Sequence, residues 1–259
     1  MKHPEGLIGW VDLVTTDTAR AAAFYGGLFG WDATEIPTPM GMNYTQFSYD
    51  GKRVAGMGPL PPDFVAAGMS SHWNSYAMVA DVDAVLSRVP AAGGEVAMPA
   101  MDVMDQGRMA MIADPSGATF GLWQPNVHEG AEIFNVPSSL AWNELQSSDV
   151  EGAKQFYSDV LGWVWQDIPQ GGYSICTVPA KEGDDKSNGG AMAIPPGVPD
   201  DVESFWLVYF AVSDCDDAME AAQDLGGSVL FPAMEMGPNR FGGLVDPTGA
   251  VFAVGSFGG

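Results

Sequence analysis

The stretch WVDLVTTDTARAAAFYGGLFGW at residues 10–31 decides the fold, because the chain repeats it as WNELQSSDVEGAKQFYSDVLGW at residues 142–163. The two copies align without a gap. Identical residues stand at Trp10/Trp142, Leu13/Leu145, Asp17/Asp149, Ala21/Ala153, Phe24/Phe156, Tyr25/Tyr157, Gly30/Gly162 and Trp31/Trp163. Such a repeat in a chain of 259 residues indicates an internal duplication and predicts two similar domains.

Each copy has the pattern of a strand followed by a helix. Apolar and polar residues alternate over residues 7–15, which predicts a strand with Trp10 and Asp12 on one face. Asp17 suits the start of a helix because its side chain can accept a backbone hydrogen bond. Gly30 suits the end of the helix because glycine readily adopts a left-handed conformation. The stretch therefore predicts a helix between Asp17 and Gly30.

The remainder of the first half predicts three strands, a second strand and helix, and three further strands. These predicted elements lie at residues 31–36, 44–49, 54–57, 72–79, 81–89, 96–98, 108–112 and 119–124. The second half repeats the same order. We therefore predict an α+β fold in which each domain is built from two β-α-β-β-β units. The predicted domains are residues 1–125 and 140–259, joined by a linker at residues 126–139.

The composition is that of a folded protein with a strongly acidic surface. Hydrophobic residues make up 46% and charged residues 17% of the chain, as in ordinary globular proteins. A net charge of −23 should repel nucleic acids and anionic membranes, so neither is an expected partner. Cys176 and Cys215 are expected to be buried free thiols. Residues 1–10 lack the apolar run of a signal peptide, so we expect a cytoplasmic protein. The sequence leaves both a monomer and a homodimer open.

The order of elements and three motifs carry a resemblance to a known family. The motifs are FYGGLFGW at residues 24–31, VADVDA at 79–84 and DPSGATFGL at 114–122, each with a counterpart in the second half. Together they resemble the glyoxalase/bleomycin-resistance/extradiol-dioxygenase group, the vicinal-oxygen-chelate superfamily. Within it the chain looks most like tandem two-domain actinobacterial proteins of the glyoxalase-like or hydroxylase type. The resemblance implies that the strands of each domain curve around a cavity.

The resemblance also places the metal-ligand positions of metal-dependent members on this chain. They fall on Trp10, Asn74 and Gly121, and in the second half on Trp142, Leu207 and Ala253. A fourth position, near residues 54–56 and 190–192, has no acidic residue or histidine. Catalytic transition-metal sites usually need three imidazole or carboxylate ligands. The histidines of the chain are only His3, His72 and His128, so we predict no metal ion and no cofactor.

Asp12, His72 and Glu144 are the candidate catalytic residues. Asp12 and Glu144 occupy equivalent positions, two residues beyond Trp10 and Trp142, and should face the cavity. A carboxylate there can act as a general acid or base, or can bind a ligand hydroxyl. His72 should share a strand face with Asn74 and could form a proton-transfer pair with Asp12. The alternative is structural, with these side chains accepting hydrogen bonds from nearby N–H groups.

The candidate ligand-binding residues are mainly aromatic side chains on the predicted cavity strands. They are Trp10, Asn74, Tyr76, Arg108, Trp123, Trp142, Trp206, Tyr209 and Arg240. Aromatic walls suit a flat aromatic ligand, and Met101, Met109 and Met111 add flexible apolar surface. Arg108 and Arg240 match in the repeat and could bind a ligand anion or pair with an acidic side chain. The alternatives are ordinary core packing and surface salt bridges.

These observations favour a metal-independent protein that binds a small apolar, and in our interpretation aromatic, metabolite. Acid–base chemistry through Asp12, His72 or Glu144 could also transform that molecule. A second hypothesis is a metal-dependent glyoxalase-like lyase or isomerase, or an oxygenase such as a hydroxylase, with an unusual metal site. A third is a non-catalytic structural or interaction protein.

Overall fold

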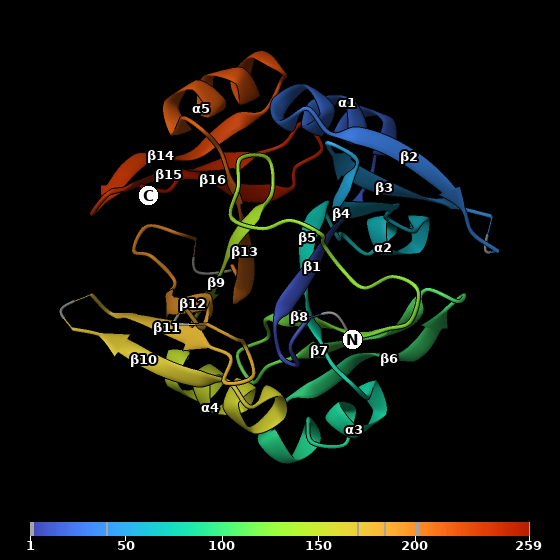
Figure 1. Ribbon diagram of the computed structural model, residues 1–259, viewed down its shortest axis with the longest axis vertical. Helices are drawn as coiled ribbons and strands as arrows, with labels where there is room; N and C mark the ends of the chain where they lie inside the picture. Colours follow the sequence, from blue (N-terminus) through green and yellow to red (C-terminus); the bar gives the residue numbers. More distant parts are fainter. Residues whose placement is uncertain (1–2, 40, 170, 184, 200–201, 259) are drawn as a thin grey trace. The chain divides into compact units, whose positions relative to one another are not determined.

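The computed structural model describes residues 3–39, 41–169, 171–183, 185–199 and 202–258 (Figure 1). The first half contains β1 (Ile8–Thr15), α1 (Thr18–Phe29), β2 (Asp32–Pro37), β3 (Asn43–Tyr49), β4 (Lys52–Pro59), α2 (Pro62–Ala66), β5 (His72–Met78), α3 (Val82–Leu86), the 3₁₀ helix η1 (Pro90–Ala92), β6 (Glu95–Val103), β7 (Gly107–Ala113) and β8 (Thr119–Pro125). The second half contains β9 (Leu140–Ser147), α4 (Val150–Leu161), β10 (Val164–Ile168), β11 (Tyr173–Thr177), β12 (Ser187–Ala193), β13 (Phe205–Ala211), α5 (Cys215–Asp224), β14 (Ser228–Met236), β15 (Asn239–Val245) and β16 (Val251–Ser256). The predicted α+β order of β-α-β-β-β units is confirmed.

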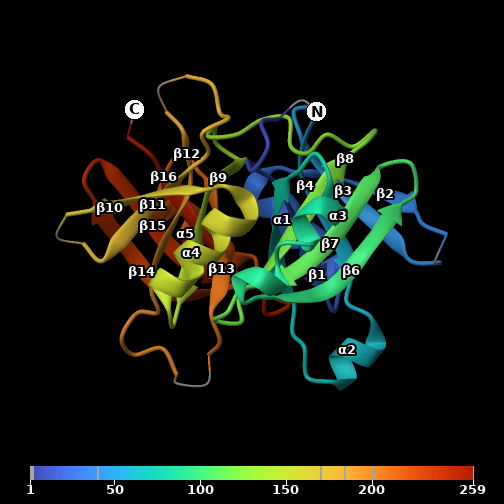
Figure 2. The same ribbon diagram turned by 90° about the horizontal axis from the view of Figure 1, so that it is seen from below.

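Each half of the chain contributes one curved sheet (Figures 1 and 2). Within the described residues the first sheet has eight strands in the order β2-β3-β4-β1-β5-β8-β7-β6, and the second has the matching order β10-β11-β12-β9-β13-β16-β15-β14. β1 pairs with β4, and β5 with β8, in parallel. A parallel pair needs a crossover connection, which helices such as α1 supply. No helix among the described residues is long and apolar enough to cross a membrane.

The repeated stretch forms its helix for the reasons that the sequence indicates. The side chain of Asp17 accepts a hydrogen bond from the backbone N–H of Arg20, and Gly30 ends α1 with a φ of 70°. Asp149 and Gly162 start and end α4 in the same way. These caps satisfy backbone groups that the helix ends leave without intrahelical partners.

Two elements differ from the sequence-based expectation. The predicted helix to Val89 ends instead at Leu86 and is followed by η1, because Pro90 lacks a backbone N–H and restricts the residue before it. The predicted strand at residues 96–98 continues through Pro99 to Val103. β6 is an edge strand, and a proline can point its missing N–H away from the sheet there.

The chain packs as two compact units, each with its own core. Unit 1 comprises residues 1–10, 75–130 and 142–207, and unit 2 comprises residues 11–74, 131–141 and 208–259. Helices α3 and α4 contact one another in unit 1, and α1 and α5 do so in unit 2. Each unit therefore combines one β-α-β-β-β unit from the first half with one from the second.

In unit 2 a buried hydrogen-bonded chain joins helix, strand and turn. Trp73 donates its indole N–H to the Tyr25 hydroxyl at 2.9 Å, and Tyr25 donates to Asp246 Oδ2 at 3.0 Å. The other oxygen, Asp246 Oδ1, accepts from the backbone N–H groups of Thr248 and Ala250. The repeated tyrosine of the first half is thereby tied to the DPTGA turn of the second half.

Unit 1 contains the counterpart with the halves exchanged. Trp206 donates to the Tyr157 hydroxyl at 2.8 Å, and Asp114 Oδ1 holds the DPSGA turn by accepting from the N–H of Ser116. Burial, and then the nearby Asp114 carboxylate, raise the pKa of Tyr157. Tyr25 has a raised pKa for the same reasons, with Asp246 as the carboxylate. Both hydroxyls therefore remain protonated hydrogen-bond donors.

The variant Tyr25→Phe should lose about 1–3 kcal/mol of unfolding free energy, because Trp73 and Asp246 would each lose a buried hydrogen-bond partner. Tyr49→Phe is the matched control, since Tyr49 is half-buried and its hydroxyl makes no hydrogen bond within the described ranges. Urea unfolding at neutral pH measures the difference. Equal losses in the two variants would contradict the assigned role of the Tyr25 hydroxyl.

The raised pKa of Tyr25 also predicts alkaline sensitivity. The unfolded chain releases this proton near pH 10, whereas the folded chain retains it to higher pH. The contribution of Tyr25 to the unfolding free energy is therefore fully present below about pH 10. Above that pH the unfolding free energy falls by about 1.4 kcal/mol per pH unit for one such tyrosine. Urea unfolding across this range should show a shallower decline for Tyr25→Phe than for the parent protein. Parallel declines would count against the prediction.

Candidate functional site

The two faces of each sheet carry different side chains. Val11 and Leu13 of β1 lie in the core of unit 2, and Leu145 of β9 lies in the core of unit 1. Because side chains alternate along a strand, Asp12 and Glu144 lie on the opposite face. We call this opposite side the helix-free face. It carries most of the residues that the sequence singled out.

Glu144 is the centre of a buried polar group on the helix-free face of unit 1. Its side chain is 7% exposed, and its Oε1 accepts a hydrogen bond of 3.1 Å from Gln146. Trp142 donates its indole N–H to the Tyr173 hydroxyl at 2.8 Å. Gly190 pairs with Glu144 in the strand register, and the Tyr173 ring occupies the space above that glycine. The four side chains and the glycine form one cluster.

Electrostatics in this cluster keep the Tyr173 hydroxyl protonated. Burial is the main cause of the raised pKa of Tyr173, and the Glu144 carboxylate raises that pKa further. The hydrogen bond from Trp142 acts in the opposite direction. The Glu144 carboxyl group beside a protonated phenol gives this face a hydrogen-bond acceptor.

Asp12 has a matching arrangement in unit 2. Asn74 of β5 donates to Asp12 Oδ1 at 3.1 Å. Gly56 pairs with Asp12, and the Tyr44 hydroxyl lies where a β carbon on Gly56 would be. The carboxylate, tyrosine and glycine therefore recur in both halves. The side-chain amide that bonds to the carboxylate has a different origin in the two halves. Gln146 is on the same strand as Glu144, whereas Asn74 lies on β5, the strand next to that of Asp12.

His72 and Asp12 do not form the predicted proton-transfer pair in the described structure. His72 Nδ1 lies 2.8 Å from the carbonyl oxygen of Ser70, while the amide on Asp12 comes from Asn74. His72 is at the first position of β5, where its half-exposed ring reaches back to the preceding turn. This placement agrees with the structural alternative for His72.

His128, and not His72, is the histidine whose ring contacts the tryptophans of the predicted site. Its position in the predicted linker did not indicate this contact. In unit 1 its ring packs edge-on against Trp10, with ring centroids 4.3 Å apart, and also contacts Trp123. Trp123 donates its indole N–H to the His128 carbonyl at 2.8 Å. The backbone N–H of His128 bonds to Gln106, so chain reversal after β8 brings the histidine back. Periodicity cannot predict such a reversal.

Tyr76 and Tyr209 occupy equivalent positions on β5 and β13. In unit 1 the Tyr76 ring fills the space above Gly121, its partner in the register. In unit 2 Tyr209 pairs with Ala253 and lies 6.1 Å from the Phe241 ring. Both tyrosines are buried on the helix-free face.

Three predicted ligand-binding residues lie elsewhere. Trp206 packs in the core of unit 1 and bonds to Tyr157, because strand alternation turns it toward the helices. Arg108 makes a two-pronged ion pair with Asp83 of α3 and another ion pair with Asp102, and Arg240 pairs with Asp216 of α5. Both arginines join a helix to a strand at the surface. These placements agree with the alternatives of core packing for Trp206 and of surface salt bridges for the two arginines.

The residues at the superfamily's metal positions do not fit a transition metal. Trp10 and Trp142 offer no ligand atom, and Asn74, whose Nδ2 donates to Asp12, offers only a weak amide oxygen. Gly121 is covered by the Tyr76 ring. Among the described residues, no cluster of three or more His, Cys, Asp or Glu side chains could hold a metal ion.

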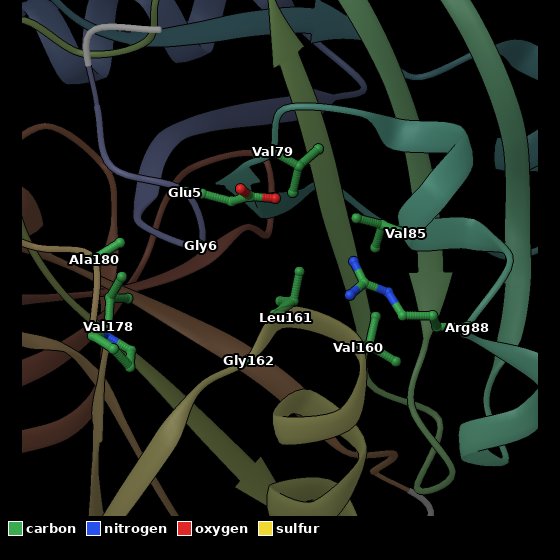
Figure 3. Close-up of a pocket in the computed structure, with 11 residues that line it drawn as sticks. Glu5, Gly6, Val79, Val85, Arg88, Val160, Leu161, Gly162, Val178 and Ala180 are labelled. Atoms are coloured by element: carbon green, nitrogen blue, oxygen red, sulfur yellow. The ribbon is translucent and has the colours of Figure 1, made fainter.

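A separate hollow of about 330 Å³ lies in unit 1 (Figure 3). Glu5 and Gly6, residues 160–162 at the end of α4, and residues 178–180 form part of its wall. Arg88 and Glu5 extend toward it with opposite charges, while most other lining residues are apolar. None of the sequence-predicted site residues lines this hollow.

Comparisons with known proteins agree with the fold and repeat. Residues 7–122 and 139–254 match the sequence pattern of the Glyoxalase/Bleomycin resistance protein/Dioxygenase superfamily. A Mycobacterium tuberculosis protein named "Putative glyoxylase CFP32" is 42% identical over 98% of this chain and 95% of its own length. The "Anthracycline biosynthesis protein DnrV" of Streptomyces peucetius is 40% identical over 96% of this chain and 92% of its own length.

Solved structures show the same fold at low sequence identity. The Mn(II)-bound glyoxalase from Novosphingobium aromaticivorans has a TM-score of 0.66 and 18% identity, with 98% of this chain and 82% of that chain covered. The 2,3-dioxygenase LapB from Pseudomonas sp. KL28 has a TM-score of 0.65 and 14% identity, with 99% and 94% covered. These similarities concern the fold.

The glycine beneath Tyr44 provides a test of this site geometry. Gly56→Ala should cost about 1–3 kcal/mol of unfolding free energy, because its new methyl group must displace the Tyr44 side chain. Gly58→Ala, on the same strand, meets only ordinary contacts and should be neutral or stabilising by about 0.5 kcal/mol. Chemical unfolding of both variants provides the comparison. Equal stability would show that Tyr44 does not depend on the absence of a side chain at position 56.

Proposed function

Because the chain belongs to the glyoxalase/bleomycin resistance protein/dioxygenase superfamily, we propose that it binds a small, flat, hydroxylated aromatic metabolite without a metal ion. The ligand lies against the helix-free faces. Its rings stack on aromatic side chains, and a hydroxyl group donates a hydrogen bond to Asp12 or Glu144. The observation that carries this proposal is the recurrence of a carboxylate, a tyrosine and a glycine on both faces.

The chemistry of the two clusters supports a ligand that combines apolar surface with a hydroxyl group. Buried carboxylates are costly unless hydrogen bonds compensate for the lost water. Gln146 and the Tyr173 hydroxyl supply such bonds to Glu144, and Asn74 supplies one to Asp12. A carboxylate has room for several donors, so each can accept a further bond from a ligand hydroxyl. The surrounding tryptophan and tyrosine rings offer flat apolar contacts.

The Streptomyces peucetius relative also supports an aromatic ligand, since its name assigns it to anthracycline biosynthesis. Anthracyclines are fused-ring aromatic compounds that carry hydroxyl groups. The relative named as a glyoxylase points instead to a lyase or isomerase reaction. The side chains at the superfamily's metal positions do not favour a metal-dependent form of that reaction.

Dihydroxyanthraquinone should quench the tryptophan fluorescence of the protein, and both Glu144→Gln and Asp12→Asn should weaken this binding. A hydrogen bond to a charged acceptor contributes about 1.5–3 kcal/mol, so the affinity of the altered site should fall roughly ten- to hundredfold. Glu220→Gln is the matched control, because Glu220 is exposed on α5. Unsubstituted anthraquinone should bind all variants alike, since it has no hydroxyl group to donate.

Two outcomes would overturn this proposal. The first is an absence of quenching by any of a panel of fused-ring aromatic compounds. The second is equal binding of dihydroxyanthraquinone by Glu144→Gln, Asp12→Asn and Glu220→Gln, which would leave the carboxylates without a role.

Elemental analysis tests the metal-independent part of the proposal. Protein purified without chelators should contain Fe, Mn, Ni and Zn far below one equivalent per chain, because the donor set lacks three imidazole or carboxylate ligands. Treatment with EDTA should leave ligand binding unchanged. A stoichiometric metal whose removal abolishes binding would favour the metal-dependent alternative.

A further inference from the structure

Four methionines lie together on the helix-free face of unit 1, and we name Met98, Met101, Met109 and Met111 the methionine face. Met98 pairs with Met111, and Met101 pairs with Met109, across β6 and β7. Directly paired residues have their side chains on the same face of a sheet. Ala110 and Ile112 alternate with these methionines and lie in the core of unit 1. The methionine side chains therefore point away from the helices.

The methionine face continues into an aromatic floor on the two neighbouring strands. Met111 pairs with Gly121, which pairs with Tyr76, and the Tyr76 ring covers that glycine. Met109 pairs with Trp123, which pairs with Met78. Two rows of sulfur-containing and aromatic side chains thus cross β6, β7, β8 and β5. None of these side chains carries a charge.

Burial changes steadily along these rows. Tyr76, Trp123 and Met78 are buried, while Met98, Met109 and Met111 are half-buried and Met101 is 39% exposed. Flexible thioether side chains in partial contact with water suit a surface that packs against a ligand. Sulfur atoms also make favourable contacts with aromatic rings.

The second half provides an internal comparison in unit 2. Its equivalent rows contain Phe231, Gly243, Ala253 and Tyr209, and Met234, Phe241, Gly255 and Ala211. The Phe231 ring occupies the space above Gly243. Phe231 and Phe241 therefore stand where the first half has Met98 and Met109, whereas Gly243 replaces Met111 and Met234 matches Met101. The methionine face distinguishes the two halves of an otherwise repeated fold.

We propose that the methionine face, with Trp123 and Tyr76, selects a ligand of several fused aromatic rings on the first half of the chain. This inference rests on the proposed function. Neighbouring strands are about 4.8 Å apart, so four strands span roughly 14 Å. A single ring would cover only part of that length. The uncharged surface favours stacking, and the flexible sulfur-containing side chains adjust to the outline of the rings.

Methyl-labelled methionine NMR of the intact chain tests this inference with dihydroxyanthraquinone as the probe. Ring currents from the bound ligand should shift the methyl signals of Met109 and Met111. The signal of Met234, the exposed methionine at the equivalent position to Met101, should shift less. Signals are assigned with single Met→Leu variants. The shifts are measured on the parent protein, and the variants serve only to assign its signals.

Affinity measurements provide the second readout. The double variant Met109→Leu/Met111→Leu keeps apolar side chains of similar volume but removes sulfur, and its affinity for dihydroxyanthraquinone should fall about three- to tenfold. Its affinity for catechol, a single-ring probe, should change less. Met234→Leu is the matched control and should bind both probes like the parent protein.

The outcomes separate the two proposals. If dihydroxyanthraquinone binds but the shifts avoid Met109 and Met111, or the double variant binds it like the parent protein, the role of the methionine face is overturned and the proposed function stands. If no aromatic probe binds at all, both are overturned.

Discussion

A buried tyrosine hydroxyl between a tryptophan and an aspartate is the interaction on which each compact unit depends. Tyr25 accepts from Trp73 and donates to Asp246, and Tyr157 accepts from Trp206 beside Asp114. In each case the tyrosine belongs to the helix of one half and the aspartate to a turn of the other. The two halves consequently share their cores. A break in this chain would leave polar groups in an environment that cannot solvate them.

This shared core determines what the opposite faces of the sheets can do. Because tryptophans such as Trp73 and Trp206 are used on the helix side, the helix-free faces present the alternate residues of the same strands. There, glycines at register positions such as Gly56, Gly121 and Gly190 make room for tyrosine rings. At the positions to which the superfamily resemblance assigns metal ligands, Trp10 packs against His128, Asn74 donates a hydrogen bond to Asp12, and the Tyr76 ring covers Gly121.

Much of the fold could be predicted from local patterns, whereas the site could be predicted only in part. The gapless repeat, the aspartate caps and the glycine ends specify the elements and their order. Strand alternation places Asp12, Glu144, Tyr76 and Tyr209 on the face where they occur. The same alternation turns Trp206 toward the helices, away from the face on which a ligand-binding role would place it. Arg108 and Arg240 match in the repeat for a structural reason, since each joins a helix to a strand.

The sequence by itself determined the duplication, the strand and helix order and the absence of metal-ligating side chains at the superfamily positions, because each is a property of residue identity and spacing. Only the tertiary structure decided which half supplies the partner of each buried tyrosine, how His128 returns to Trp10, and why His72 does not meet Asp12. The contacts of the buried tyrosines and of His128 join residues far apart in the chain. Local periodicity contains no information about which distant segments meet, because the packing of whole sheets and helices selects them.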